Sequence, residues 1–271
     1  LLYGQTRREV KRDETVLILA ADGPNNYNYI HGGQMNQLMG RTAIVTGGTG
    51  ALGRAVTFEL LTRGANVMCT YLKDEELDAT FALRQSFGDR VVFGKADVTR
   101  QPHVAKLVSK TEETFSRIDI LVNVVGAFTM GPIGATGEDD WDKMMDINLK
   151  SAFLCSKAVV PVMIINEWGR IINVGARPAL KGSSRMSAYG ASKAGVLNLT
   201  QSMAEELRDH DITVNAVLPG TMDTPWNRAA MPDEDYSKWV PTSDVAKVVA
   251  FLSSEEARSV SGAFVPVFGK S

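Results

Sequence analysis

The sequence contains few of the residues that bind metals or form disulfides. Only two cysteines, Cys69 and Cys155, occur in 271 residues, and both lie in apolar segments. We therefore expect reduced thiols in the core of a cytoplasmic protein and no disulfide. Only three histidines occur, scattered without the spacing of metal ligands, so no metal site is predicted.

Basic charge and long apolar runs are also scarce. The formal net charge is -2 at pH 7, which argues against nucleic acid or an anionic membrane as a partner. No apolar run approaches the roughly 18 residues that a membrane-spanning helix needs. Hydrophobic residues make up 44% of the chain and charged residues 22%, as in ordinary globular domains.

Residues 1–34 differ in composition from the rest of the chain. They combine many charged residues, one short apolar run and a polar stretch rich in Asn and Tyr. The apolar run is too short for a secretory signal peptide. We interpret residues 1–34 as an N-terminal extension, either upstream or vector-derived sequence or an arm used in oligomer contacts. The folded domain is expected over residues 35–271.

From residue 41 onward, short β-rich runs alternate with longer helical patterns. The predicted strands are Thr42–Thr46, Asn66–Tyr71, Val91–Lys95, Ile118–Asn123, Arg170–Val174, Thr213–Leu218 and Ala263–Val267. The predicted helices are Gly53–Arg63, Asp74–Phe87, Pro102–Phe115, Asp139–Ile164, Ala188–Leu207 and Thr242–Leu252. This alternation predicts a single doubly wound α/β domain, a parallel sheet of about seven strands with helices on both faces.

The stretch TGGTGALG follows the first predicted strand and opens the first predicted helix. Gly47, Gly50 and Gly53 would let the chain turn tightly and bring backbone N–H groups against a pyrophosphate. Thr49 and Leu52 lie in the same turn and are also predicted to contact the cofactor. In this strand–turn–helix context the motif favours dinucleotide binding over a glycine-rich turn without a ligand.

The end of the second predicted strand, in CTYLKDEE, bears on the form of the dinucleotide. An acidic residue there accepts the ribose hydroxyls of NAD, but Tyr71 stands at that position. Lys73 follows two residues later and either binds a 2′-phosphate or is an ordinary solvated lysine. We expect Tyr71 and Lys73 to line the adenosine end, with NADP(H) favoured and NAD(H) as the alternative.

Tyr189 and Lys193 are four residues apart in SAYGASKAG, a stretch predicted to be helical. This spacing places both side chains on one face of the helix. A free tyrosine titrates near ~10, and an adjacent ammonium group would lower the pKa towards neutrality. Tyr189 could then act as a general acid or base; the alternative is an ordinary surface pair.

Taken in order, the motifs resemble those of the short-chain dehydrogenase/reductase family, from residue 35 to the end of the chain. The matching stretches are TGGTGALG; Asp97-Val98; LVNVVG with Asn123 and Gly126; MDINLKSAF with Asn148; YGASK; and LPGTMDT with Pro219, Gly220 and Thr224. The resemblance implies a Rossmann-type fold, an NAD(P) cofactor and hydride transfer between nicotinamide and a small-molecule substrate. It also implies a homodimer or homotetramer assembled through the two longest predicted helices.

The resemblance also implies roles for individual residues. Tyr189 would donate a proton to the substrate heteroatom, and Lys193 would bind the nicotinamide ribose and lower the pKa of Tyr189. Asn148 would hold a water in the proton relay. The remaining implied cofactor contacts are Asp97 and Val98 at the adenine, Asn123 at the adenosine ribose, Thr224 at the nicotinamide amide, and Gly126, Pro219 and Gly220 along the same surface.

Two positions depart from the family's pattern. Compact members usually carry TGxxxGxG, whereas Ala51 stands at the sixth position here and the glycine is at the fifth. The longer sugar-nucleotide epimerase branch shares this spacing. The catalytic serine of the family lies thirteen residues before the tyrosine, and Ala176 replaces it. Losing one such hydrogen-bond donor costs on the order of 10²–10³ in rate.

Three interpretations of Ala176 are open. In the first, the missing hydrogen-bond donor is supplied by another residue, either Ser183, Ser184, Ser187 or Arg177. In the second, the substrate needs no such donor. The second interpretation is suggested by dihydropteridine reductases, which lack the serine. The stretches GARPAL and DTPWNRAAMPDEDYSKW resemble the corresponding stretches of those enzymes, which usually use NADH. In the third, the protein binds a dinucleotide as a redox sensor without catalysis, which the intact catalytic residues disfavour. We therefore predict an active reductase of a C=O or C=N group.

The stretch after Pro219-Gly220, where the family folds a lid over the nicotinamide, is rich in apolar and aromatic residues. These residues are Met222, Trp226, Met231, Tyr236 and Trp239. An apolar lid suits a planar or hydrophobic substrate and excludes water. Alternatively, the same side chains form the core of a small subdomain. Phe128 and Met130 could line the same pocket.

Overall fold

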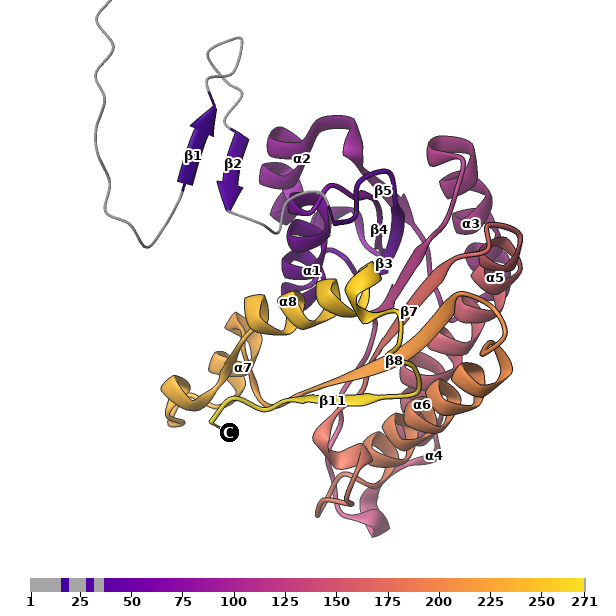
Figure 1. Cartoon of the computed structure of the whole chain (residues 1–271). Helices are drawn as coiled ribbons and strands as arrows, with labels where there is room; N and C mark the ends of the chain where they lie inside the picture. The colour runs from indigo at the N-terminus through magenta and orange to yellow at the C-terminus, as the bar shows by residue number, and fades with distance from the viewer. Residues whose placement is uncertain (1–15, 20–27, 32–36, 271) are drawn as a thin grey trace, which may run out of the picture.

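Seven parallel strands form the central sheet of the molecule. The structure, a computed structural model, describes residues 16–19, 28–31 and 37–270. The strands of this sheet are β3 (Thr42–Thr46), β4 (Asn66–Tyr71), β5 (Val91–Lys95), β6 (Ile120–Asn123), β7 (Gly169–Val174), β8 (Ile212–Pro219) and β11 (Phe264–Val267). They pair in the order β11-β8-β7-β6-β3-β4-β5 (Figure 1).

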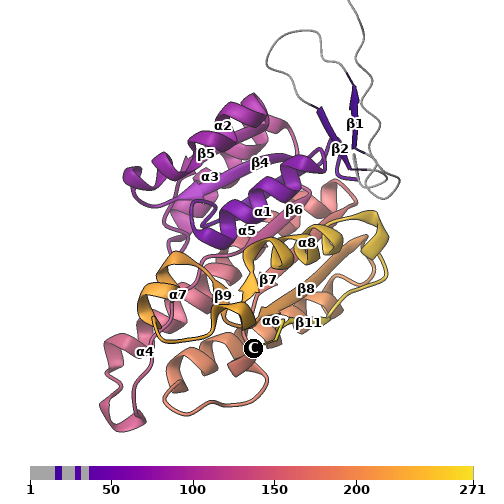
Figure 2. The ribbon, with the colours of Figure 1, turned by 90° about the vertical axis from the view of Figure 1, so that its left-hand side faces the viewer.

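Helices cover both faces of the sheet (Figure 2). The helices are α1 (Ala51–Thr62), α2 (Phe81–Phe87), α3 (Gln101–Phe115), α4 (Glu138–Met144), α5 (Ser151–Ile165), α6 (Ser187–Glu206), α7 (Pro225–Ala230) and α8 (Thr242–Leu252). Residues of α1 and α8 belong to one hydrophobic core, and residues of α3, α5 and α6 belong to the other. Along β3, Ala43 and Val45 join the first core and Ile44 joins the second. A strand buried on both faces must be apolar throughout, as the sequence pattern indicated.

The strand order reverses between β3 and β6. From β3 the chain adds β4 and β5 on one side and then returns to add β6, β7, β8 and β11 on the other. The connections that leave the carboxyl ends of β3 and β6 therefore run in opposite directions. Ligands of doubly wound folds bind in the crevice at such a point, so the fold itself predicts where the site lies.

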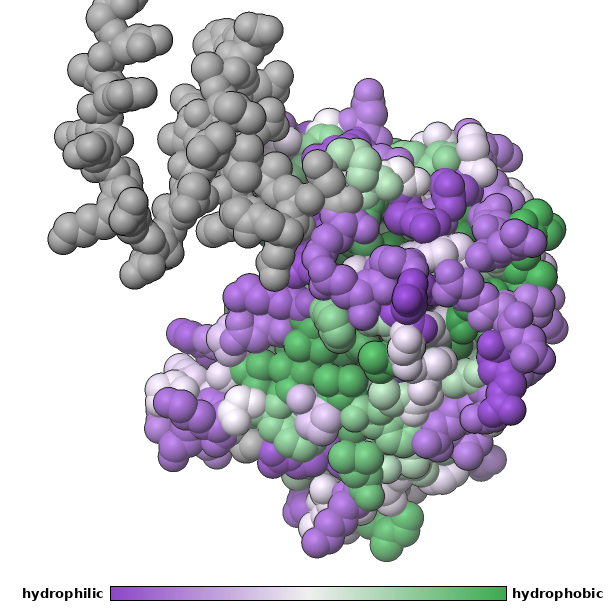
Figure 3. Space-filling view, viewed as in Figure 1, coloured by the Kyte–Doolittle hydropathy of each residue, from purple (hydrophilic) through white to green (hydrophobic). Residues whose placement is uncertain are grey.

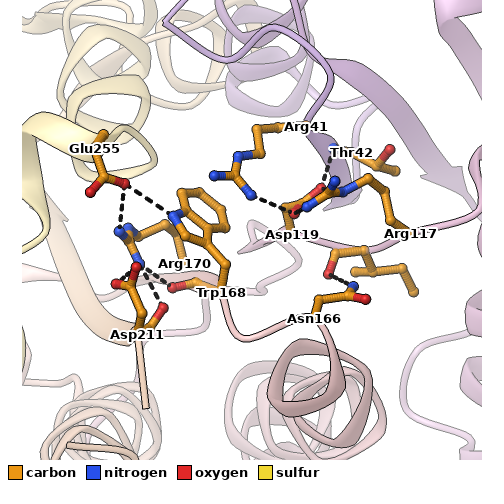
Figure 4. A network of polar contacts seen from close by, with 11 residues as sticks. Arg41, Thr42, Arg117, Asp119, Asn166, Trp168, Arg170, Asp211 and Glu255 are labelled. Carbon is orange, nitrogen blue, oxygen red and sulfur yellow. Dashed lines mark hydrogen bonds and ion pairs between the residues drawn. The ribbon is translucent and has the colours of Figure 1, made fainter.

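At the amino ends of the strands, which we call the amino edge of the sheet, Asp119 joins three strands (Figure 4). The carboxyl ends of the strands form the carboxyl edge. Its buried carboxylate accepts hydrogen bonds from the backbone N–H of Thr42 at 2.8 Å, Arg41 at 3.1 Å and Arg117 at 2.7 Å. Its carbonyl oxygen accepts the N–H of Arg170 at 2.9 Å. A buried carboxylate with several donors is a satisfied structural charge.

Two guanidinium groups stack on Trp168 in the same region (Figure 4). Arg41 lies 3.7 Å and Arg170 lies 4.1 Å from the ring centroid. The indole N–H donates to Glu255 at 3.1 Å, and the fully buried Arg170 donates to Asp211 at 3.0 Å and to Glu255 at 3.3 Å. These contacts tie the amino ends of β7 and β8 to the segment that follows α8.

The predicted boundaries of β3, β4 and β5 are confirmed, and those of β6, β7, β8 and β11 differ by one or two residues. The helix predicted over 74–87 is a 3-10 helix, η1 (Asp74–Thr80), followed by α2. The helix predicted over 139–164 contains a π-helical segment, η4 (Met145–Lys150), between α4 and α5. Strands β9 (Met222–Asp223) and β10 (Val240–Pro241) and helix α7 were not predicted, because they are too short to show a hydrophobic period.

Most of residues 1–34 lie outside the described residues. Within this stretch, β1 (Val16–Leu19) and β2 (Asn28–His31) pair as an antiparallel two-stranded sheet. The interpretation of this stretch as an extension or an oligomer arm stays a prediction.

The helical stretch Glu138–Ile165 contains 28 residues and has a mean hydropathy of 1.4 in its most apolar window, so length and composition alone would allow it to cross a membrane. No membrane-spanning helix had been predicted from the sequence. Here α5 packs against the sheet through the second core, and an apolar core helix passes the same length test. Figure 3 shows hydrophobic residues gathered at the surface around α8 and the edge strand β11, where Phe251 is 41% exposed.

Both cysteines are buried free thiols, as predicted. Desolvation raises the pKa of each thiol to about 12. Neither thiol is therefore poised as a nucleophile at neutral pH.

Candidate active site

The glycine turn connects β3 to α1 at the carboxyl edge of the sheet. Gly47 has a φ of +61°, and a Cβ atom on Gly53 would lie 2.1 Å from the Gly47 carbonyl oxygen. Only glycine fits both positions. Gly50 precedes α1, and no described side chain caps the first N–H groups of that helix. This arrangement fits a dinucleotide pyrophosphate. Ala51 is the first residue of α1, and Leu52 is buried in the first core.

Glu76 links the glycine turn to the end of β4. The hydroxyl of Thr49 donates to Glu76 Oε2 at 2.6 Å, and the backbone N–H of Leu72 donates to the same oxygen at 3.3 Å. Tyr71, which stands at the position predicted for an acid, packs partly buried against the first core. Lys73 is exposed and precedes η1. The sequence analysis did not single out Glu76, because its contact with Thr49 joins residues 27 positions apart.

A cavity of about 320 Å³ lies beside the carboxyl end of β5. Its lining residues are Leu72, Lys95, Ala96, Asp97, His103 and Lys106. The carboxylate of Asp97 accepts hydrogen bonds from the hydroxyl of Thr99 at 2.6 Å and from its N–H at 3.0 Å, which holds the pKa of Asp97 below its usual range. Val98 is buried next to it. The cavity lies where the family resemblance implies the adenine.

Tyr189 and Lys193 lie on the first two turns of α6, near the carboxyl end of β7. The ammonium of Lys193, which is 4% exposed, donates to the carbonyl oxygen of Val174 at 2.7 Å. A Cβ atom on Gly126 would lie 3.2 Å from that ammonium. The ring of Phe128 meets the ring of Tyr189 edge to face, with centroids 4.9 Å apart. The loop after β6 and the start of α6 are therefore in contact at Tyr189 and Lys193.

Burial moves the pKa values of the two groups in opposite directions. Desolvation raises the pKa of Tyr189 to about 12 and lowers that of Lys193 to about 8. The predicted lowering of the Tyr189 pKa is therefore wrong in direction, because removing a phenolate from water raises its pKa. At neutral pH the tyrosine is protonated and the lysine is largely charged, which are the states needed to donate a proton.

Asn148 lies in the π-helical segment η4. Its Oδ1 accepts the N–H of Ala127 at 2.9 Å, and its Nδ2 donates to the Ala127 carbonyl and to the Ser192 hydroxyl, both at 3.0 Å. The Ser192 hydroxyl in turn donates to the Tyr189 carbonyl at 2.8 Å. The amide of Asn148 thus fixes the loop after β6 to the first turn of α6. Its role in holding a water stays a prediction.

Ala176 lies just beyond the end of β7 and is 6% exposed. Of the alternative donors, Ser183 and Ser184 are exposed on the intervening loop, and Arg177 stacks on the ring of a phenylalanine near the C-terminus. The hydroxyl of Ser187 is buried without a hydrogen-bond partner among the described residues and borders a small cavity of about 70 Å³. None of these contacts identifies a replacement for the serine.

Asn123 and Thr224 use their side chains within the protein. Asn123 Nδ2 donates to the side-chain oxygen of Asn173 at 2.8 Å, in the buried part of the sheet. The hydroxyl of Thr224 accepts the N–H of Asn227 at 3.1 Å and caps α7. The side-chain oxygen of Asn123 is buried without a hydrogen-bond partner among the described residues, and the cofactor contacts of Asn123 and Thr224 stay predictions.

The segment after Gly220 folds partly on itself. The rings of Tyr236 and Trp239 pack at a centroid distance of 4.7 Å, and the guanidinium of Arg228 lies 4.8 Å from the Tyr236 ring. Trp239 is buried, whereas Trp226 is 66% exposed. Tyr236 and Trp239 therefore pack within a small subdomain, as the second interpretation of this segment expected. The exposed side chain of Trp226 remains available to a ligand.

Comparisons with known proteins identify the family of this chain. Residues 41–235 match the family model of the short chain dehydrogenases, so the chain belongs to the short-chain dehydrogenase/reductase family. It is 33% identical over 240 residues to the BbsD subunit of a hydroxy(phenyl)methylsuccinyl-CoA dehydrogenase from Thauera aromatica, covering 86% of this chain and 96% of that protein. It is 31% identical over 241 residues to the 3-oxoacyl-acyl-carrier-protein reductase of Thermotoga maritima, covering 86% and 98%.

Solved structures show the same fold. Levodione reductase matches with a TM-score of 0.80 and 29% identity, covering 86% of this chain and 97% of that one. A blue fluorescent protein from a metagenomic library, solved in complex with NADPH, matches with a TM-score of 0.79 and 32% identity, covering 87% and 99%. The Rossmann-type fold is confirmed, and the protein is an NAD(P)-dependent oxidoreductase that acts on carbonyl or alcohol groups. The resemblance to dihydropteridine reductases stays a prediction.

Proposed function

We propose that the protein reduces a C=O or C=N group of a small molecule, with Tyr189 as the proton donor. The observation that carries this proposal is the meeting of Tyr189, Lys193 and the loop fixed by Asn148 at the carboxyl edge of the sheet, at the same edge as the glycine turn. When bound, NAD(P)H supplies the hydride.

The protein's own groups manage the proton. The pKa of Tyr189, raised to about 12 by burial, keeps its hydroxyl protonated until the substrate heteroatom gains charge. The largely charged Lys193 stabilises the phenolate that remains after the transfer. Asn148 holds Ala127 and Ser192 in place by hydrogen bonds. Because the Ser192 hydroxyl donates to the Tyr189 carbonyl, Asn148 positions Tyr189 indirectly.

Ala176 supports a second candidate within this reaction class. A methyl group where the family has a hydroxyl leaves one donor fewer at the reacting atom, which suits a substrate that needs none. A dihydropteridine-reductase-like enzyme that acts on a C=N group is that candidate. A dinucleotide sensor without catalysis is a third, which the arrangement of Tyr189 and Lys193 disfavours.

The proposal also includes the form of the cofactor, the cellular location and the oligomeric state predicted from the sequence. The absence of an acid at Tyr71 and the presence of Lys73 favour NADP(H), with NAD(H) as the alternative. We also propose a cytoplasmic homodimer or homotetramer. Exposed apolar side chains on α5, Phe153 at 43% and Ile165 at 81%, support contacts through that helix. Sedimentation velocity of the purified protein measures the oligomer directly.

The decisive experiment is a substrate panel. Purified protein is assayed with NADH and with NADPH against ketones, 3-oxoacyl thioesters and quinonoid dihydropterin. Turnover of carbonyl substrates supports the first candidate, and turnover of dihydropterin alone supports the second. Dinucleotide binding without turnover of any substrate would support the sensor and contradict the proposed reduction.

A further inference from the structure

A small cavity lies beside Tyr189 and takes no part in the proton transfer proposed above. It has a volume of about 70 Å³ and is lined by the loop after β6, the first turn of α4 and the start of α6. Thr129, in its wall, follows Phe128, whose ring packs against the ring of Tyr189. Ala188, also in its wall, precedes Tyr189 in the chain. The cavity therefore adjoins the proposed proton donor along two chain segments.

Three polar side chains of this cavity have no partner within the protein. The hydroxyl oxygen of Ser187 is buried without a hydrogen-bond partner among the described residues. Asp140 and Arg185 also line the cavity, and neither side chain forms a hydrogen bond or an ion pair with another part of the chain that the structure describes. Water can serve the two exposed charged groups, but the hydroxyl of Ser187 is shielded and calls for a partner inside the cavity.

The backbone holds Arg185 at the rim of the cavity. The N–H of Gly131 donates to the carbonyl oxygen of Arg185 at 2.8 Å, which fixes the loop before α6 to the loop after β6. Arg185 has a φ of +65°, in the left-handed region where a glycine would be less strained. The cavity is therefore closed on this side by a fixed contact between the two loops.

The charges around the cavity disfavour an ionised ligand group. Asp140 belongs to the first turn of α4, which also contains Glu138 and Asp139, so a carboxylate or a phosphate would be repelled there. Arg185 opposes an ammonium group in the same way. A neutral group that both donates and accepts hydrogen bonds is not opposed by either charge. The amide unit, with one N–H donor and one C=O acceptor, is such a group.

We propose that this cavity binds a carboxamide or lactam group of the substrate, whose N–H donates to Asp140 and whose carbonyl accepts from Ser187 and Arg185. The substrate is then a carbonyl or imine compound that carries an amide near the reducible bond. A volume of about 70 Å³ has room for roughly two water molecules, so it takes the amide group and leaves the rest of the substrate at Tyr189. This inference rests on the proposed function and names its substrate class.

The test compares substrates that differ in the amide N–H. Steady-state kinetics with NADH and with NADPH are measured for isatin, 3-oxobutanamide and 4-oxopentanamide, in which the ketone and the amide are separated by different distances. Their counterparts are N-methylisatin and the two N,N-dimethyl amides. In at least one pair, kcat/KM should be about tenfold to a hundredfold higher for the compound with the N–H, because a hydrogen bond to a charged acceptor is lost on methylation.

Three variants separate amide binding from a structural effect. Asp140→Ala removes the acceptor and should reduce the preference for the N–H compound to within about threefold. Ser187→Ala should raise KM of the amide substrates by about tenfold with less effect on kcat, because the hydroxyl acts in binding. Asp139→Ala, in the same turn but outside the lining of the cavity, is the matched control and should keep the full preference. Thermal unfolding verifies that each variant is folded.

A binding measurement makes the test independent of turnover. Saturation-transfer NMR with the dinucleotide present compares oxindole, which contains the lactam but no ketone, with N-methyloxindole. We expect saturation transfer to oxindole and a weaker signal for its methylated counterpart, and we expect the difference to disappear in Asp140→Ala.

Reduction of ketones with equal kcat/KM in every pair would overturn this inference and leave the proposed function intact, since the cavity would then hold only water. A preference that persists in Asp140→Ala would overturn it as well. Selective binding of oxindole without turnover of any carbonyl or imine compound would support the amide site and contradict the proposed reduction. Neither selective binding nor turnover would overturn both.

Discussion

The two edges of the central sheet, at the amino and the carboxyl ends of its strands, both contain buried polar groups but use them differently. At the amino edge, Asp119 and Arg170 are buried with oppositely charged partners within 3.3 Å. At the carboxyl edge, burial shifts the pKa of Tyr189 to about 12 and that of Lys193 to about 8, with desolvation as the cause in both cases.

The two edges differ in how their buried polar groups are stabilised. A buried charge that accepts or donates several charged hydrogen bonds is stable in one protonation state. A buried titratable group stabilised mainly by backbone contacts, as Lys193 is by Val174, responds to pH and to a neighbouring reaction. The amino edge therefore stabilises the arrangement of the strands, and the carboxyl edge is where we propose that the reaction takes place. Substitutions at the two edges should separate stability from activity.

The largest effect is expected for Tyr189→Phe. Removing the proton donor should lower kcat by about 10³, because general acid catalysis contributes on the order of 10²–10⁴. Steady-state kinetics, dinucleotide titration and thermal unfolding are measured on the same preparation, and only kcat should change. Tyr236→Phe, in the segment after Gly220, is the matched control and should retain activity. A kcat within tenfold of wild type in Tyr189→Phe would show that another group donates the proton.

Asp119→Ala should have the largest effect on stability. Removing the carboxylate leaves the guanidinium groups of Arg41 and Arg117 and the Thr42 N–H without their shared acceptor, which should cost about 3–5 kcal/mol. Urea unfolding measures the loss, and kcat of the folded protein at low temperature should stay unchanged. Glu205→Ala breaks only the exposed pair with Arg208 and should change stability little. A comparable loss in both variants would contradict the assignment of stability to the amino edge.

Lys193→Met should separate the two roles through pH. The folded-state pKa of Lys193, about 8, lies below its ordinary value of 10.5, so the charged lysine destabilises the fold below pH 8. This cost disappears as the pH rises towards 10.5. The variant should therefore be more stable than wild type at pH 7, by roughly 1–3 kcal/mol after the lost hydrogen bond is counted, and the difference should shrink at pH 10.

Urea unfolding of both proteins at the two pH values tests this prediction. Tyr189, present in both, cancels from the comparison. The variant should also lose activity. A stability difference that is the same at pH 7 and pH 10 would mean that burial does not shift the lysine as the structure indicates.

The smallest effect is expected for Ala176→Ser. If the pocket or the substrate already compensates for the missing hydroxyl, kcat/KM should stay within about tenfold of wild type. Ala179→Ser, three residues on, controls for the added hydroxyl. A rise of about a hundredfold in Ala176→Ser alone would instead show that the missing donor limits the enzyme.

Much of the fold could be predicted because its strands are buried on both faces. The runs of β3, β4 and β5 are short, apolar and bounded by turn residues, and their limits were predicted correctly. The π-helical segment η4 could not be predicted, since its sequence has the same apolar period as the helices on either side. What distinguishes it is the pairing of Asn148 with Ala127, a contact between residues 21 positions apart.

The site was predictable to the extent that its residues are close in sequence. Tyr189 and Lys193 share one helix face, and the glycine turn is a continuous motif. Glu76 was missed because its contact with Thr49 spans 27 positions. The direction of the Tyr189 pKa shift was also missed, because i, i+4 spacing reveals a neighbouring charge but not how far the tyrosine is removed from water.

The sequence by itself determined the doubly wound sheet, the family and the placement of Tyr189 and Lys193 on one helix face, since periodicity and short motifs are local properties. The tertiary structure decided which groups are charged, which side chains are already engaged and which acid contacts the glycine turn. Those properties depend on burial and on contacts between distant strands, because the energy of a charge is set by everything packed around it.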